Sequence, residues 1–329
     1  MIITRTPFRV SFFGGGTDLK SFYKKSSGQV LSAAIDKYLY VVVKKKLGIV
    51  EYKYRVNWST VEFTNKISNI KNPVARECLR YFNINYPIEI TTFADIPANT
   101  GLGSSSAFTV GLVNALYALQ GKKVSKKKIA TTAAKIEIDM IGRKIGKQDH
   151  FACCYGGLNI FKFYGNETVK VLPLNILKKN INKLEKNIIL FYTKIKRNSH
   201  KVLKVQQNIN KLQFNSLNEM KNLVDESKKI ILGKKIDMMS FGSLLNISWN
   251  RKKKVNKNSS NKIIDKFYDK ALYSGAYGGK LLGAGSGGFL MFIANKKIQK
   301  KIIKNLSKLN YLNLKFDYSG TKVTYNSKQ

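Results

Sequence analysis

The chain has 329 residues, with 59 lysines and arginines against 19 aspartates and glutamates, for a formal net charge of +40 at pH 7. This length suffices for two domains with a sizeable core. No stretch of about 18 uncharged apolar residues occurs, which argues against a membrane span. Three cysteines are too few for a disulfide framework, and no Cys/His spacing suits zinc. With no signal-peptide layout at its start, we expect a soluble cytoplasmic protein.

The positive charge would attract polyanions such as nucleic acid, acidic membrane surfaces and phosphorylated metabolites. The lysines are spread along the whole chain, many of them in Lys-Asn-Ile-rich stretches such as Leu177–Asn187 and Lys252–Lys262. No zinc finger and no aromatic-basic interleaving of the kind found in single-strand binders is present. We interpret most of the charge as solvated surface, which disfavours a nucleic-acid function and favours small anionic substrates.

The N-terminal segment combines a strand with a glycine-rich turn. Pro7–Phe13 predicts a strand that runs into three glycines and then Thr17 and Asp18. Successive glycines let the backbone turn tightly and approach a ligand, and Asp18 can accept hydrogen bonds from hydroxyls. Arg9 lies inside this apolar strand. It either points into a cleft or, on an edge strand, extends to water.

The segment Pro97–Ala107 joins a glycine-rich turn to three serines. Apolar residues follow at helical spacing, so we expect a helix that starts near Ser104 and ends near Gly121. A helix start offers free N–H groups and a positive dipole end, and the glycines let a phosphate come close. The serines either cap the helix or lend an oxygen to a phosphate-bound metal. The alternative is a capped helix without a ligand. No Gly-x-x-x-x-Gly-Lys-Ser/Thr loop occurs.

Two acidic residues stand out because acidic residues are scarce. Lys126–Arg143 predicts a helix with Glu137 in its apolar stripe, where a carboxylate needs a cation or a hydrogen-bond partner. Glu137 is either salt-bridged to a lysine or a magnesium ligand. Asp149 falls in a predicted loop, Gly146–His150. It is a candidate general base if a hydroxyl substrate lies beside it, and otherwise a loop aspartate.

A third glycine run, Gly283–Gly288, formally satisfies the dinucleotide pattern Gly-x-Gly-x-x-Gly. That fingerprint needs a strand before it and a helix after it. Here a predicted helix, Ile263–Gly275, precedes the run and a predicted strand, Phe289–Ile293, follows it. We therefore expect a turn that backs onto another loop or onto the reacting groups.

Three segments together, Thr6–Asp18, Pro97–Ala107 and Lys280–Gly288, resemble the motifs of the GHMP kinases, the family of galactokinase, homoserine kinase, mevalonate kinase and phosphomevalonate kinase. They occur in the family's order and spacing and bracket nearly the whole chain. Galactokinase-like members carry Gly-Glu-His-Thr-Asp where this chain has Gly14–Asp18. This variant is more similar to the branch that acts on D-glycero-D-manno-heptose 7-phosphate, as are Gly146–Asp149 and Tyr155–Asn159.

The resemblance implies an α+β fold of two domains. A ribosomal-protein-like ATP-binding domain would span residues 1–172, and a ferredoxin-like domain would span residues 173–329. Strands near Ile188–Tyr192 and Phe289–Ile293 would belong to the second domain, and Leu177–Asn187 would be a connection. ATP would lie across the Gly101–Ser106 turn, with the sugar between the domains.

The resemblance also implies roles for individual residues. Asp149 would be the catalytic base with Arg9 as its basic partner, and Ser105 with Glu137 would hold Mg²⁺. Either neighbouring serine remains an alternative to Ser105 for the metal. The expected ATP-binding residues are Pro97, Gly101, Leu102, Gly103, Ser104, Ser105 and Ser106. The expected substrate-binding residues are Gly15, Gly16, Thr17, Asp18, Arg197, Gly285 and Ser286.

The implied reaction transfers a phosphoryl group from ATP to the anomeric hydroxyl of heptose 7-phosphate, on the route to nucleotide-activated heptose for surface polysaccharide. Arg197 is the first candidate for the sugar phosphate because arginine binds phosphate in a bidentate fork, with Lys252 and Lys253 next. Another GHMP sugar kinase, fucokinase-like or galactokinase-like, remains an alternative. A basic nucleic-acid-binding protein on a degenerate kinase fold is a third. The sequence leaves the oligomeric state open, a homodimer included.

Overall fold

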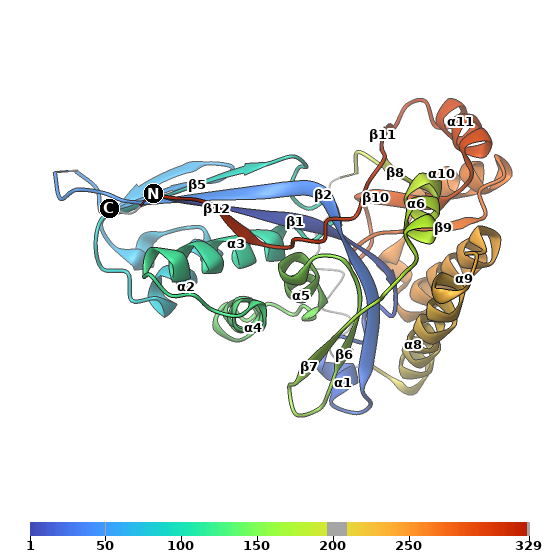
Figure 1. Ribbon diagram of the computed structural model, residues 1–329, viewed down its shortest axis with the longest axis horizontal. Coiled ribbons are helices and arrows are strands. Elements are labelled where there is room, and N and C mark those ends of the chain that lie inside the picture. Colours follow the sequence, from blue (N-terminus) through green and yellow to red (C-terminus); the bar gives the residue numbers. More distant parts are fainter. Residues whose placement is uncertain (50, 196–208, 328–329) are drawn as a thin grey trace.

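The structure is a computed structural model that describes residues 1–49, 51–195 and 209–327. Two sheets lie side by side, each with its own helices, in an α+β arrangement (Figure 1). The two chain ends lie together at the end of the first sheet that is remote from the second (Figure 1). Among the described helices, none is both long and apolar enough to cross a membrane.

The first sheet is organised around one long strand, β2 (Gly28–Lys45). Its first half pairs with β6 and its second half with β5, while β1 pairs along most of its length. The strand order is β12-β1-β2-β5-β3-β4, and β6 and β7 branch from β2. The other strands are β1 (Ile2–Phe13), β3 (Tyr54–Asn57), β4 (Val61–Thr64), β5 (Ile88–Ala94), β6 (Leu158–Phe163), β7 (Val169–Pro173) and β12 (Lys322–Asn326).

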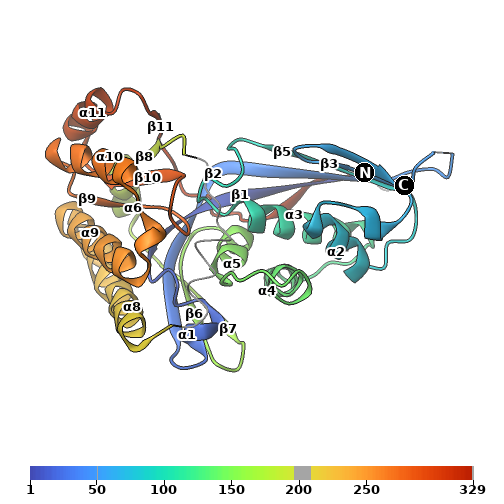
Figure 2. The same cartoon turned by 180° about the vertical axis from the view of Figure 1, so that it is seen from behind.

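Helices α2 to α5 lie along one face of this sheet in both views (Figures 1 and 2). Helix α3 (Ser104–Leu119) starts where the sequence predicts and is buried for most of its length. It rests directly on β1, because a Cβ at Gly111 would lie 3.0 Å from Thr6 Oγ1. The other helices of this layer are η1 (Ile67–Asn69), α2 (Pro73–Tyr81), α4 (Lys126–Lys135), the π-helical turn η2 (Ile136–Met140) and α5 (Gln148–Tyr155). The short helix α1 (Lys20–Tyr23) lies apart from this layer, beside β6 and β7, and its Phe22 stacks on Phe214 (Figure 1).

The second sheet is four-stranded and antiparallel, in the order β11-β8-β10-β9. Its chain order, with helices between the first and second strands and between the third and fourth, is ferredoxin-like as predicted. The predicted strands coincide with β8 (Ile188–Tyr192) and β10 (Phe289–Ile293). The remaining elements are α6 (Lys178–Asn187), α8 (Lys211–Leu232), α9 (Met238–Val255), η3 (Lys257–Ser259), α10 (Lys262–Tyr273), β9 (Gly278–Leu281), α11 (Lys296–Asn305) and β11 (Asn310–Leu312).

Side chains of β8 and β10 point alternately to the two faces of the second sheet, and those on one face pack against the first unit. Successive side chains of a strand point to opposite faces. Leu190 and Met291 belong to the core cluster shared with the first sheet, whereas Phe191 and Phe292 pack in a second cluster with α10 and α11. Both faces of the second sheet are therefore buried, and one core runs through both units.

Two predicted connections differ from the structure. Leu177–Asn187 is not a connection but largely the helix α6, because its Asn180 and Leu184 lie on one face and are buried. The last strand, β12, returns to pair with β1, and Thr6 and Thr321 share a buried hydrogen bond of 2.8 Å. The predicted division after residue 172 assigned the whole C-terminal part of the chain to the second domain and so missed this pairing. The sequence of an exposed five-residue strand does not indicate which strand it pairs with.

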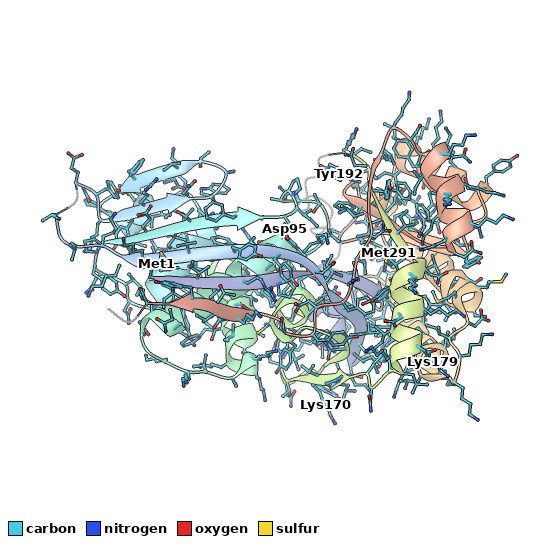
Figure 3. All side chains as sticks on the ribbon, turned by 45° about the horizontal axis from the view of Figure 1, so that its top comes forward. Met1, Asp95, Lys170, Lys179, Tyr192 and Met291 are labelled. Atoms are coloured by element: carbon cyan, nitrogen blue, oxygen red, sulfur yellow. The ribbon has the colours of Figure 1, made fainter. Side chains whose placement is uncertain are left out.

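The lysines cover the surface without concentrating on one element. Lys170 and Lys179 project outward, whereas Met291 lies within the second sheet (Figure 3). Among the described residues, Lys252 and Lys280 are the only buried lysines, and both line the cavity between the two units. The general charge is thus solvated surface, and these two lysines are distinct from it.

Candidate active site

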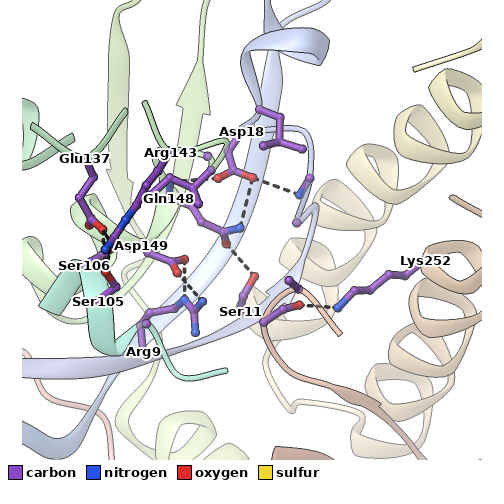
Figure 4. A pocket seen from close by; sticks show the side chains of 18 of the residues that line it. Arg9, Ser11, Asp18, Ser105, Ser106, Glu137, Arg143, Gln148, Asp149 and Lys252 are labelled. Atoms are coloured by element: carbon purple, nitrogen blue, oxygen red, sulfur yellow. Dashed lines mark hydrogen bonds and ion pairs between the residues drawn. The ribbon is translucent and has the colours of Figure 1, made fainter. Parts of the chain in front are cut away.

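The three glycine segments meet at one cavity of about 210 Å³ between the two units. Its walls come from β1 and the turn after it, the start of α3, the segment from η2 to α5, and helices α8 and α9 (Figure 4). Gly15, Gly16 and Asp18 line it from one side, and Gly103 to Ser106 line it from another.

Arg9 and Asp149 form a two-bond ion pair at the centre. Arg9 Nε and Nη2 donate to the two Asp149 oxygens at 2.7 and 2.6 Å (Figure 4). Arg9 Nη1 donates to the Gly101 carbonyl at 2.7 Å. Arg9 is 3% exposed. It therefore points into the cleft, and the alternative of an edge-strand residue extending to water is wrong. Burial lowers the pKa of Arg9, but Asp149 outweighs burial and raises it above its ordinary value.

Asp149 does not lie in a loop, as the sequence predicted, but in the first turn of α5. The helix begins at Gln148 because the residues that follow Asp149, His150 to Cys154, are all buried. Cys153 and Cys154, near the end of this helix, are free, buried core residues. A helix holds Asp149 more firmly than a loop would, and so fixes its carboxylate against Arg9.

The turn before α3 needs its glycines. Gly101 and Gly103 have φ of +91° and +82°, which L side chains rarely adopt. A Cβ at Gly101 would lie 2.6 Å from the Leu282 carbonyl oxygen, in the third glycine segment. Phe289 N also donates to the Thr100 oxygen at 3.0 Å. The Gly283–Gly288 turn thus backs onto another loop, as predicted.

Ser105 and Glu137 contact each other at the N-terminal end of α3. Ser105 Oγ donates to Glu137 Oε1 at 2.6 Å, and Arg143 Nη1 contacts both Ser105 and Glu137 (Figure 4). Behind the cavity wall, His150 Nε2 lies 2.8 Å from Glu137 Oε2. Burial by itself raises the pKa of Glu137, but His150, Arg143 and Ser105 together lower it to about 2. Glu137 is therefore an anion at neutral pH despite being fully buried.

Glu137 does not sit in a regular helix. The predicted helix Lys126–Arg143 is regular only to Lys135, and a π-helical turn carries Glu137. Gly142, with φ of +76°, follows this turn and directs Arg143 back toward Glu137. Such turns are frequent at functional sites. The sequence periodicity gave no sign of it, since the apolar stripe continues through the turn.

Asp18 forms a second polar cluster. Its oxygens accept hydrogen bonds from Gly16 N and Gln148 N at 3.1 Å each and from Gln148 Nε2 at 3.2 Å. Ser11 Oγ donates to Gln148 Oε1 at 2.9 Å. Burial, together with the charge of Asp149, raises the pKa of Asp18 to about 6 in spite of these bonds. A Cβ at Gly146 would lie 1.8 Å from Asp18 Oδ2, so glycine there makes room for the carboxylate.

Several predicted site residues lie away from the cavity wall. Thr17 Oγ1 donates to the Gly14 and Gln29 carbonyls and holds the turn together. Ser286 donates from its side chain to Asn258 O, and a Cβ at Gly285 would meet Ser259. The cavity wall also omits Pro97, Gly101, Leu102, Thr17, Gly285 and Ser286. For the phosphate candidates, Lys252 lines the cavity, Lys253 pairs with Asp265 at 3.6 Å, and Arg197 lies outside the described residues.

Sequence reasoning missed six polar residues at or behind the wall: Ser11, Asn99, Arg143, Gln148, His150 and Lys280. Lys280 Nζ donates to Phe12 O at 2.8 Å across the two units. Burial and the neighbouring Arg9 lower its pKa to about 7. The signal that would have found Lys280 is the one used for Arg9, a single cation inside a buried strand.

The comparisons with known proteins agree with this geometry. The family model described as the GHMP kinases N terminal domain matches residues 68–157, and that of the GHMP kinases C terminal matches residues 224–312. The chain therefore belongs to the GHMP kinases, and it is a kinase, a phosphotransferase.

Individual relatives indicate which members of the GHMP kinases this chain resembles. D-glycero-alpha-D-manno-heptose 7-phosphate kinase of Campylobacter jejuni is 29% identical over 93% of each chain. The bifunctional fucokinase/GDP-fucose pyrophosphorylase of Arabidopsis thaliana is 24% identical over 91% of this chain and 30% of its own. The crystal structure of a D-glycero-D-manno-heptose 1-phosphate kinase from Bacteroides thetaiotaomicron superposes over 100% of both chains with a TM-score of 0.81, at 21% identity, and so supports the fold. The sequence relatives support a sugar kinase of the GHMP family.

Proposed function

We propose that this sugar kinase transfers the γ-phosphoryl group of ATP to the anomeric hydroxyl of D-glycero-D-manno-heptose 7-phosphate. The product would be the 1,7-bisphosphate, a precursor of nucleotide-activated heptose for surface polysaccharide. The observation that carries the proposal is the Arg9–Asp149 pair, which lies between the Ser105–Glu137 contact and the Asp18 cluster (Figure 4). The name of the Campylobacter relative supports the choice of sugar.

In the proposed reaction Asp149 accepts the proton of the sugar's C1 hydroxyl while that oxygen bonds to the γ-phosphorus and ADP leaves. Arg9 holds both Asp149 oxygens and, through Gly101, ties the base to the turn that would face the phosphates. A positioned base contributes about 10²–10⁴ in rate. Asp18, oriented by Gln148, would accept hydrogen bonds from sugar hydroxyls.

Ser105 and Glu137 fit a magnesium ion because both present hard oxygen donors, and the carboxylate stays ionised. Within the described residues no group of three or more His, Cys, Asp or Glu is arranged to hold a metal by itself. Two protein ligands plus phosphate oxygens is the usual arrangement for Mg²⁺. When bound, the ion would offset charge on the transferred phosphoryl group.

The proposal is tested by an ADP-release assay with a panel of sugars, and ³¹P NMR of the product. The panel contains heptose 7-phosphate, heptose 1-phosphate, unphosphorylated heptose, fucose, galactose and mannose. We expect turnover with the 7-phosphate and a new anomeric phosphate signal. Equal or better turnover of unphosphorylated heptose or fucose would replace the proposal by a free-sugar kinase. Phosphorylation of the 1-phosphate alone would reverse the order of the two phosphates.

A further inference from the structure

Arg143 occupies the position between Ser105 and Glu137. One nitrogen, Nη1, contacts both Ser105 Oγ and Glu137 Oε1, the same two oxygens that the proposed function assigns to magnesium (Figure 4). The Glu137 side chain is fully buried, and the Arg143 side chain is 18% exposed. A cation thus already neutralises the Glu137 carboxylate where a metal would bind.

The choice of residue is unusual for this chain. Only eight of its 59 cationic residues are arginines, at positions 5, 9, 55, 76, 80, 143, 197 and 251. Among the residues that line the cavity, the arginines are Arg9 and Arg143. Arg9 is locked by Asp149 and Gly101, whereas Arg143 follows Gly142 in a segment outside regular structure. Arg143 can therefore leave without unfolding an element.

We propose that Arg143 is a built-in cation that occupies the metal position of the empty enzyme and must leave it when the metal–nucleotide complex binds. This inference rests on the assignment of Ser105 and Glu137 in the proposed function. Arg143 Nη1 contacts both Ser105 Oγ and Glu137 Oε1, so a metal bound to the same two oxygens would have to occupy the space that Nη1 fills, and the like charges would also repel. Arg143 and the metal are therefore mutually exclusive at this oxygen, and Arg143 sets how strongly the enzyme prefers metal-bound over metal-free nucleotide.

The expected size follows from populations. If Arg143 occupies the position in about nine molecules of ten, it lowers the apparent affinity for the metal complex about tenfold, since only the remaining fraction is competent. Metal-free nucleotide places no ion between Ser105 and Glu137, so Arg143 does not lower its apparent affinity in this way. The quantity to measure is the ratio of the two dissociation constants, without and with metal.

The experiment titrates a non-hydrolysable ATP analogue into the full chain by calorimetry, once with EDTA and once with saturating Mg²⁺. No turnover is needed. For Arg143→Gln we expect the preference for the metal complex to rise about tenfold. Lys144→Gln is the matched control, because it removes the same charge from the adjacent, exposed residue outside the cavity. It should change the ratio less than about twofold, as expected for a screened surface charge.

The same Arg143 substitution made in a chain that also lacks the Glu137 charge separates competition for Glu137 from a general effect of charge. Competition at Glu137 predicts that Arg143→Gln no longer raises the ratio in a Glu137→Gln chain, whereas a general field effect would persist. Ser105→Ala, at an exposed position, is the alternative background if Glu137→Gln fails to fold. In the Ser105→Ala chain, too, Arg143→Gln should raise the ratio of the two dissociation constants less than it does in the unmodified chain.

The outcomes are distinguishable. An unchanged ratio in Arg143→Gln, or an equal rise in both backgrounds, overturns the inference alone. If the doubly substituted chain prefers the metal complex as strongly as Arg143→Gln does, Glu137 is not a metal ligand. That result overturns the inference together with the metal assignment of the proposed function.

Discussion

His150 Nε2 lies 2.8 Å from Glu137 Oε2, and both side chains are completely buried. His150 follows Asp149 in the first turn of α5, so one helical turn supplies the proposed base and also supports the proposed metal-binding carboxylate. Ser105 and Arg143 hold the other Glu137 oxygen, and His150 holds this one. Helix α5 therefore positions both the proposed base, Asp149, and, through His150, the proposed metal ligand, Glu137.

Replacing His150 by phenylalanine should loosen Glu137. The variant keeps an aromatic ring but leaves a buried carboxylate oxygen without its donor, at a cost of about 1–3 kcal/mol in the free energy of unfolding. We also expect a higher Mg²⁺ concentration for half-maximal activity. His150→Gln, which retains a donor, should recover part of both. Normal stability and an unchanged Mg²⁺ requirement in His150→Phe would show that the contact does not position Glu137.

Asp149→Asn should keep affinity for ATP but lose turnover by about 10² or more, because base catalysis is worth that much. The change also leaves the buried Arg9 without a charged partner, which costs stability. Thermal unfolding and ATP calorimetry on the same preparation separate the two effects. Near-normal turnover in a folded variant would remove Asp149 from the role of base.

Substrate binding should depend on pH through Asp18. Its pKa of about 6 means that the carboxyl is protonated below pH 6 and loses acceptor capacity for sugar hydroxyls. We expect kcat/KM for the sugar to fall as the pH drops through 6, and Asp18→Asn to abolish this step. A raised carboxyl pKa makes the folded state bind the proton more tightly, so this group stabilises the fold below about pH 4 and loses that contribution as the pH rises through 6. Loss of activity near pH 5.5 without a fall in melting temperature caused by Asp18 would therefore fit, and a step that persists in Asp18→Asn would not.

Recognition of the 7-phosphate should be specific rather than a result of the overall charge. Removing that phosphate should cost more than about 100-fold in kcat/KM, since charge-assisted hydrogen bonds contribute about 1.5–3 kcal/mol each. Lys252→Met or Arg197→Ala should shrink this gap while leaving the KM for ATP nearly unchanged. Lys253→Met is the control on the same helix, because Lys253 does not line the cavity. A gap that survives both substitutions would move the phosphate site elsewhere.

Much of the fold was predictable because it is encoded locally. Apolar residues at helical spacing after the Gly101–Ser106 turn predicted α3, and a short apolar run predicted β10 at its observed bounds. The strand β8 was expected from the family resemblance and also lies where expected. The π-helical turn at Glu137 and the helical start at Gln148 were not predictable in this way. Their backbone is decided by which side chains find room in the core.

By itself, the sequence determined which residue types were available for chemistry: glycines where φ must be positive, as at Gly101 and Gly103, and a cation and carboxylates in otherwise apolar surroundings. Only the tertiary structure decided their partners. Arg9 meets Asp149 across 140 positions, and Asp18 meets Gln148 across 130. The reason is physical: local patterns specify helices and strands, but contacts between distant residues depend on how those elements pack, and packing energy is shared among many residues of the core.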